Sequence, residues 1–394
     1  MTRVSLSKWS AALGLALLAT ACGGATDPGQ SAGNETGPRK AVALPDEVKI
    51  GATLPLTGSG AAWGASISQA MNLAAKEINA NGGVNGKNVK IAFEDHRAEA
   101  QQGASAFRKL AEVDGVPVVV TVNSGPVLAQ IPIAEATKTL LFDSGTTSPQ
   151  VRKGGAYVFS NVPKADDEAA EQARYAFEQL KFKKAAILSR QDESGTNFAR
   201  ELKTTFEKLG GDVVFEAAHQ PDATDFRPAL ARLKASGAEV AFIPTYINEA
   251  ATLLRQSVEM KVDVTWIAYS TVLNSAFIKQ LGDASENLTF YASTLGWAPE
   301  EPAGPTAKFV KAYQAAYKEA PEFFGANAYD AVYVIVEAMK ACDCYDPEGI
   351  AQGLLDLKPF AGVTGETAFD DDGMAVKPIL WYRIKSDGSL ERQK

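Results

Sequence analysis

The chain has 394 residues, of which 46% are hydrophobic and 22% charged, an ordinary balance for a soluble globular protein. Its formal net charge of −8 argues against a nucleic-acid partner, because phosphate binding requires a basic surface. With only two His and three Cys residues, the sequence also excludes a His-rich metal site.

The N-terminus has the pattern of an export signal. Two basic residues precede an uncharged apolar run, residues 11–21, that is too short to span a bilayer. The run ends in Leu-Ala-Thr-Ala before Cys22, which is similar to a bacterial lipobox. We therefore predict a signal peptide at 1–21, a lipidated Cys22 and a flexible tether at 22–46. The alternative is ordinary signal cleavage beside an incidental Cys.

From residue 47 the apolar pattern alternates between the periods of strands and helices. The predicted strands are 48–54, 89–93, 116–122, 139–142, 184–189, 212–215, 239–243, 264–268 and 379–384. The predicted helices are 63–81, 98–113, 131–138, 166–180, 196–209, 226–235, 249–260, 306–317 and 329–341. This order predicts an α/β protein with parallel sheets covered on both faces, and its two cycles predict two doubly wound, Rossmann-like lobes.

Open parallel sheets bind ligands beyond the carboxyl ends of their strands, so the loops there are the candidate site. Ser124 follows the strand 116–122 and is a good N-cap for a helix whose free N–H groups favour an anion. The loop 143–149 follows the next strand and carries hydroxyls around Gly145. We expect the hydroxyls of these neighbouring loops to converge on one ligand. A plain cap and a plain turn are the alternatives, and Trp63 either walls a pocket or fills the core.

The motifs of common enzymes are missing from the sequence. It contains no phosphate-binding loop, no GxSxG elbow and no HExxH pair, so we predict no enzyme activity, no cofactor and no metal. Cys342 and Cys344 are spaced too tightly for an easy disulfide, and a strained bridge or two thiols both remain open.

Several segments together resemble the branched-chain amino-acid-binding proteins of bacterial ABC transporters, in their lipoprotein form. The matching segments are 50–58, 63–64, 78–86, 144–149, 225–226, Tyr246 and 254–256. The resemblance implies a type I periplasmic-binding-protein fold, with a ligand cleft between two lobes. It implies an N-terminal lobe of 47–164 plus 296–377 and a C-terminal lobe of 165–295 plus 378–394. It also implies a solute-binding function without catalysis.

The resemblance assigns the ligand contacts to the two loops already noted. Ser124 and Thr147 would hold the ligand's carboxylate, and the Gly145 carbonyl would accept a hydrogen bond from an ammonium group. Thr146 lies in the same loop. The side chains that the resemblance assigns to the walls of the cleft are Trp63 and Tyr246.

Two positions of the second lobe depart from the family's pattern. Ser270 stands where the family places an acid that neutralises the ligand's ammonium, and Ser194 stands where it places an aromatic clamp. An unpaired buried ammonium is costly, so either another acid serves or the ligand lacks an amine. The substitute acids that the sequence offers are Asp143, Glu193 and Glu249.

The expected partners are a small amino acid or related carboxylate, the membrane subunits of an ABC transporter and, through the lipid anchor, a bacterial membrane. Two alternatives remain open. The ligand is a non-amino organic or aromatic acid, or the protein is a ligand sensor that reports to a signalling partner.

Overall fold

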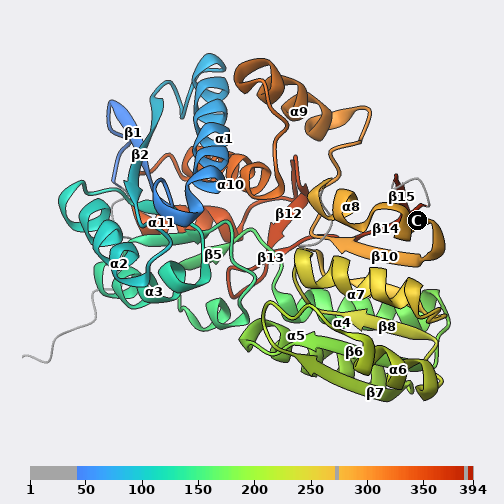
Figure 1. Ribbon diagram of the computed structural model, residues 1–394. Coiled ribbons are helices and arrows are strands. Elements are labelled where there is room, and N and C mark those ends of the chain that lie inside the picture. Colours follow the sequence, from blue (N-terminus) through green and yellow to red (C-terminus); the bar gives the residue numbers. More distant parts are fainter. Residues whose placement is uncertain (1–41, 271–274, 386–388, 394) are drawn as a thin grey trace, which may run out of the picture. The chain divides into compact units, whose positions relative to one another are not determined.

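A computed structural model describes residues 42–270, 275–385 and 389–393 (Figure 1). The predicted signal peptide, Cys22 and most of the predicted tether lie outside these residues. From residue 41 onward the chain forms one compact unit. It contains two large sheets and a small third one.

The first large sheet is entirely parallel, with the order β2-β1-β3-β4-β5. Its strands are β1 (Glu47–Leu54), β2 (Asn88–Asp95), β3 (Val118–Thr121), β4 (Leu140–Asp143) and β5 (Val158–Ser160). All four residues of β3 are buried, as are all four of β4. The continuous β-branched run of the sequence is therefore a central strand that is covered on both faces.

Helices cover both faces of this sheet. One face packs on α1 (Ala61–Ala80), α10 (Phe323–Cys342) and α11 (Pro347–Leu355). The other face packs on α2 (Ala100–Arg108) and α3 (Ser124–Thr137). Successive residues of β1 face opposite sides of the sheet. Ile50 contributes to the first of these cores, and the neighbouring Gly51 leaves room for Leu110 and Val119 on the other side.

The second large sheet repeats the strand order of the first and extends it, as β7-β6-β8-β9-β10-β14-β15. Its parallel strands are β6 (Lys184–Arg190), β7 (Asp212–His219), β8 (Val240–Ile243), β9 (Thr265–Ala268) and β10 (Thr289–Thr294). Its antiparallel strands are β14 (Leu380–Ile384) and β15 (Leu390–Arg392).

Two helix layers enclose this sheet as well. One core joins the sheet to α4 (Ala165–Arg174) and α5 (Glu193–Lys208). The opposite core joins it to α6 (Arg227–Ser236), α7 (Ile247–Glu259) and α8 (Ser275–Leu281). Both large sheets are thus doubly wound, as the alternating pattern predicted.

The remaining elements are short. The third sheet holds the antiparallel strands β11 (Phe360–Gly362), β12 (Gly365–Phe369) and β13 (Ala375–Val376), and α9 (Gly304–Tyr317) precedes α10. The π-helical turns that end α2 and α4 are Lys109–Val113 and Tyr175–Gln179. The 3-10 turns are Gly58–Gly60, Pro149–Lys153 and Gly282–Asn287. A disulfide joins Cys342 to Cys344, whose Cα atoms lie 5.1 Å apart across Asp343, which has a φ of 47°.

Some sequence predictions need correction. Helix α3 begins at Ser124, seven residues before the predicted start at 131. Gly125 and Pro126 suggested a loop, but a Pro in the first turn costs no hydrogen bond, because the first N–H groups of a helix have no partner within it. Strand β7 runs on to His219, and β5, α8, β10 and α11 were not predicted.

The interior position of β1, between β2 and β3, allows a test of this packing. Ile50 is fully buried, and we expect Ile50→Ala to lower the free energy of unfolding by about 2–5 kcal/mol, the usual cost of such a cavity. Val376, which is 62% exposed, offers the matched control Val376→Ala, for which we expect a change below about 0.5 kcal/mol. Urea unfolding measures both, and equal losses would contradict the assigned burial.

Candidate functional site

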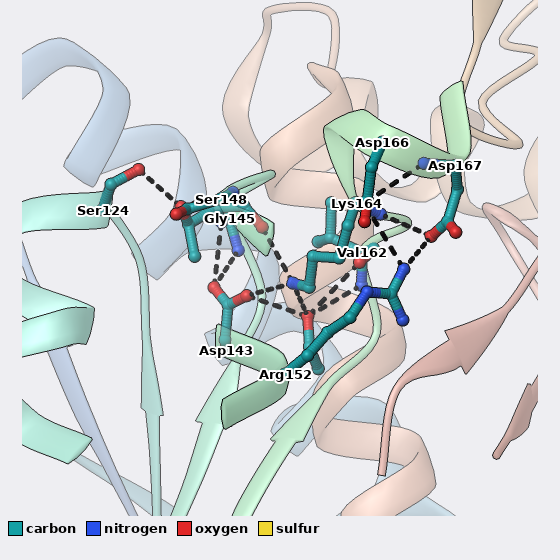
Figure 2. Close-up of polar contacts among 11 residues, drawn as sticks. Ser124, Asp143, Gly145, Ser148, Arg152, Val162, Lys164, Asp166 and Asp167 are labelled. Atoms are coloured by element: carbon teal, nitrogen blue, oxygen red, sulfur yellow. Dashed lines mark hydrogen bonds and ion pairs between the residues drawn. The ribbon is translucent and has the colours of Figure 1, made fainter. Parts of the chain in front are cut away.

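The predicted convergence of hydroxyl groups occurs at the carboxyl ends of β3 and β4. The Ser124 and Thr146 hydroxyl oxygens lie 2.5 Å apart (Figure 2). Ser124 is the first residue of α3 rather than its N-cap, a position taken by Asn123 with a φ of 71°. The Ser124 hydroxyl is therefore directed to the neighbouring loop instead of capping its own helix, while the helix still presents its free N–H groups here.

A buried ion pair holds the loop that carries Thr146. Oδ1 of Asp143 accepts hydrogen bonds from the backbone N–H groups of Gly145, at 3.1 Å, and Thr146, at 2.9 Å. Its Oδ2 accepts from Lys164 Nζ and from Ser160 Oγ, both at 2.8 Å. Nζ of Lys164 also donates to the Thr146 carbonyl at 3.0 Å. Figure 2 shows these contacts meeting beneath the loop.

This network corrects one expectation. The side chains of Asp143 and Lys164 are 0% and 1% exposed, so the carboxylate is fully committed to a protein cation. Burial lowers the pKa of Lys164, and the Asp143 charge opposes that shift. Asp143 therefore shapes the loop and is not a free acid for a ligand's ammonium.

The remaining candidate beside the first sheet is an aromatic residue near the start of α1. Trp63 is half-buried, and its ring meets Phe324 edge-on with centroids 4.6 Å apart. It belongs to the rim of the core between α1 and α10. Its role as a wall of the cleft stays a prediction.

The second large sheet has a narrow hollow at the corresponding strand ends, called the cavity below, which in this structure has no room for a water molecule. Its lining residues are Arg190, Ser194, Gly195, Phe198, Pro244, Thr245, Tyr246 and Tyr269. The predicted site residues Ser194, in the first turn of α5, and Tyr246, in the loop that follows β8, are thus brought together. Gly195 is required in the first turn of α5, since a Cβ there would lie 2.3 Å from the Arg190 carbonyl oxygen.

Sequence reasoning did not identify Arg190, the last residue of β6. Its guanidinium pairs with Glu249 at 2.6 Å and with Asp192 at 2.7 Å, and it lies over the Tyr246 ring at 4.6 Å. Glu249, the second candidate acid, is therefore already paired. The side chain of the third, Glu193, lies outside the described part of the structure. A charged residue that ends a buried strand was the available signal for Arg190.

Tyr269, which ends the run of buried residues at β9, was also missed. It is 4% exposed, and its hydroxyl lies 3.3 Å from Thr147 Oγ1 and hydrogen-bonds with Ser194. Burial raises the pKa of this phenol above its usual range, so it remains neutral. Tyr269 thereby links two predicted site residues that lie 47 positions apart in the sequence.

Ser270 has a different partner from the one expected. Its backbone N–H and its hydroxyl donate to the two carboxylate oxygens of Glu168, at 2.8 and 2.9 Å. Glu168 is fully buried on α4, and this burial raises its pKa to about 7, although hydrogen bonds from Ser293 and Ser270 oppose the shift. Ser270 is thus hydrogen-bonded to an acid that lies 102 residues earlier in the sequence.

Comparison with known proteins identifies the family. Residues 47–389 match the profile of a family described as periplasmic binding protein. The chain belongs to the periplasmic binding protein family. Membership gives this binding protein an extracytoplasmic location.

Individual relatives agree with this assignment. The Leu/Ile/Val-binding protein homolog 1 of Brucella abortus is 27% identical, over 83% of this chain and 87% of the relative. The leucine-, isoleucine-, valine-, threonine- and alanine-binding protein of Pseudomonas aeruginosa is 29% identical, with the same two coverages. A crystal structure of the branched-chain amino acid transporter substrate-binding protein LivJ from Streptococcus pneumoniae, in complex with isoleucine, is 28% identical. It has a TM-score of 0.73 and covers 88% of this chain and 98% of that one.

These likenesses bear out the fold predicted from the sequence, the type I periplasmic-binding-protein fold with doubly wound α/β lobes. Within the described residues, no helix of this binding protein is long and apolar enough to cross a membrane. Nor does the described part contain a group of three or more His, Cys, Asp or Glu side chains that is suited to a metal ion.

The ion pair beneath the Thr146 loop yields a stability prediction. Lys164→Met removes the cation but leaves Asp143 buried, so we expect the free energy of unfolding to fall by about 3–5 kcal/mol. The control Lys153→Met alters an exposed Lys in the same region, and we expect it to change by less than about 0.5 kcal/mol. Chemical denaturation at pH 7 measures the difference. A Lys164→Met protein as stable as the control would show that the pair does not hold the loop.

Proposed function

We propose that this protein is the solute-binding component of an ABC importer and that it captures a small amino acid or related carboxylate. Ligand binding would stabilise a closed arrangement of two lobes, which the membrane subunits of the transporter would recognise. The protein would act by binding and release, without catalysis.

One observation carries this proposal. The hydroxyl groups of Ser124, the first residue of α3, and Thr146, in the loop after β4, meet at the N-terminus of α3. Ser124 and the free N–H groups of α3 form a donor-bearing surface that suits a carboxylate, and the buried hydroxyl of Thr146 orients Ser124. The Asp143–Lys164 pair fixes this surface before any ligand arrives, which lowers the entropic cost of binding.

Sheet membership supports a division into two lobes. We propose that residues 47–164 plus 296–377 form the N-terminal lobe and that 165–295 plus 378–394 form the C-terminal lobe. In support, the first sheet draws its strands only from 47–160, and the second draws its strands from 184–294 and 380–392. Closure would bring the Thr147 loop of one sheet and the Tyr246 loop of the other onto the same ligand.

The ligand class is supported by the relatives. Those of Brucella abortus and Pseudomonas aeruginosa are named for binding branched-chain and small amino acids, and the Streptococcus pneumoniae structure holds isoleucine. The decisive experiment is a thermal-shift screen of the purified protein with amino acids, aliphatic acids and aromatic acids. A ligand at one hundred times its dissociation constant should add about 2.7 kcal/mol of stability. No shift with any carboxylate would refute the proposal.

The carboxylate seat can be tested by substitution. Each hydrogen bond to a charged group contributes about 1.5–3 kcal/mol, so we expect Ser124→Ala and Thr147→Ala each to weaken binding tenfold or more. Ser105→Ala, on the exposed side of α2, is the matched control and should bind like the wild type. Titration calorimetry with the best ligand of the screen provides the measurement. Wild-type affinity in both site variants would show that these residues do not bind the ligand's carboxylate.

We further propose that Cys22 carries the lipid that anchors the protein to the bacterial membrane. The supporting observation is the uncharged run that ends in small residues before this Cys. We expect the wild-type protein to enter the detergent phase on Triton X-114 partition and Cys22→Ala to remain in the aqueous phase. Equal partition of the two proteins would contradict a lipid anchor at Cys22.

A further inference from the structure

Glu168 is a buried acid whose surroundings contain no balancing charge within the described residues. It lies in α4 and is 0% exposed, and no Lys, Arg or His of the described part forms an ion pair with it. Oε1 accepts from Ser270 N at 2.8 Å, from Ser293 Oγ at 2.6 Å and from Gln172 Nε2 at 3.4 Å, while Oε2 accepts from Ser270 Oγ at 2.9 Å. Burying an ionisable group without a partner charge lowers stability, and groups of this kind are concentrated at functional sites.

The geometry connects this acid to the candidate site. Glu168, Gln172 and Ser293 are buried, whereas Ser270 is only half-buried, so Ser270 is the member of the cluster that a ligand can approach. Its chain neighbour Tyr269 lines the cavity of the second sheet and contacts Thr147 of the hydroxyl loop. Ser270 itself does not line the cavity, but it joins the cluster to Tyr269, which does.

The hydrogen-bond chemistry of Ser270 then follows from one proton count. A serine hydroxyl has one hydrogen to donate, and an ionised carboxylate can only accept. While Glu168 is ionised, the Ser270 hydrogen is committed to it, and any third group at this oxygen must be a donor. The pair thus presents an acceptor backed by a negative charge, which suits an ammonium group.

We propose that Glu168, acting through Ser270, is the positioning residue that makes this side of the site select for a ligand amine. This inference rests on the proposed binding of a small carboxylate and assigns the discrimination between amino acids and amine-free acids to one buried side chain. The Glu168 carboxylate does not touch the ligand. It acts through Ser270, whose hydroxyl donates to the carboxylate and can therefore only accept a hydrogen bond from the ligand.

Protonation of Glu168 changes the Ser270 hydroxyl from a group that accepts a hydrogen bond from the ligand to one that can donate. Burial raises the pKa of Glu168 to about 7, so the acid becomes neutral as the pH falls through that value. A protonated Glu168 can donate to Ser270, which frees the serine hydrogen for an acceptor on the ligand. Among the described residues, the titratable group facing Glu168 is Tyr269, which stays neutral in this range, and the contacts from β10 and from α4 itself, Ser293 and Gln172, do not ionise.

The test compares amines with their amine-free counterparts in Glu168→Gln and the wild type. Calorimetry at pH 8 would use the standard L-amino acids and, for each one that binds, the acid with hydrogen in place of the amino group. We expect the wild type to bind the amino acid at least a hundredfold more tightly than its amine-free counterpart. Glu168→Gln should bind the amino acid at least tenfold more weakly than the wild type does, with unchanged affinity for the counterpart. The control Glu171→Gln, on the same helix but partly exposed and paired with Arg174, should match the wild type.

The pH profile separates positioning from a merely structural role. Between pH 7 and 5.5 we expect wild-type affinity for the amino acid to fall by up to tenfold per unit, because the ionised acid is required, and that of Glu168→Gln to stay flat. If Glu168→Gln does not fold, Ser270→Ala keeps the acid, removes the hydroxyl and should lose the same preference for the amine.

Distinct results overturn the two proposals. Binding of amine-free acids alone, equal binding of amino acids and their counterparts, or an unchanged preference in Glu168→Gln would overturn the role of Glu168 and leave the carboxylate-binding function intact. An absence of binding by any carboxylate to the wild type would overturn both.

Discussion

Parallel pairing of the strands is the constraint on which the whole candidate site depends. Parallel neighbours must end at the same edge of a sheet, so the loops after β1, β3 and β4 lie together, and so do those after β6, β8 and β9. The chain order reverses between β1 and β3 in the first sheet and between β6 and β8 in the second, which is where an open α/β sheet leaves a crevice. Ser124 and Tyr246 occupy equivalent places in the two repeats.

The two halves of the site treat buried charge in opposite ways. Beneath the first sheet's loop, Asp143 and Lys164 neutralise each other, and their hydrogen bonds make the loop rigid. Beside the second sheet's cavity, Glu168 accepts hydrogen bonds from Ser270, Ser293 and Gln172 and forms no ion pair among the described residues. A paired charge is suited to holding shape, whereas an unpaired one is suited to sensing a ligand or a proton.

Local signals in the sequence predicted most of the fold and part of the site. Continuous apolar runs identified the central strands, and Gly-rich breaks ended the helices, because both depend on nearest neighbours. The Ser124 and Thr146 hydroxyls could be placed together because neighbouring parallel strands share an edge. The predicted start of helix α3 was too late, because Gly125 and Pro126 are typical of loops. A Pro is tolerated in the first turn of a helix, but the sequence did not show that the helix begins at Ser124.

By itself, the sequence determined the alternation of strands and helices, the family and the loops that carry hydroxyls. Only the tertiary structure decided which charges are paired. Lys164 reaches Asp143 across 21 residues, Arg190 reaches Glu249 across 59, and Ser270 reaches Glu168 across 102. Hydrogen bonds and ion pairs act over about 3 Å, and no periodicity in a sequence encodes which distant side chains come within that distance.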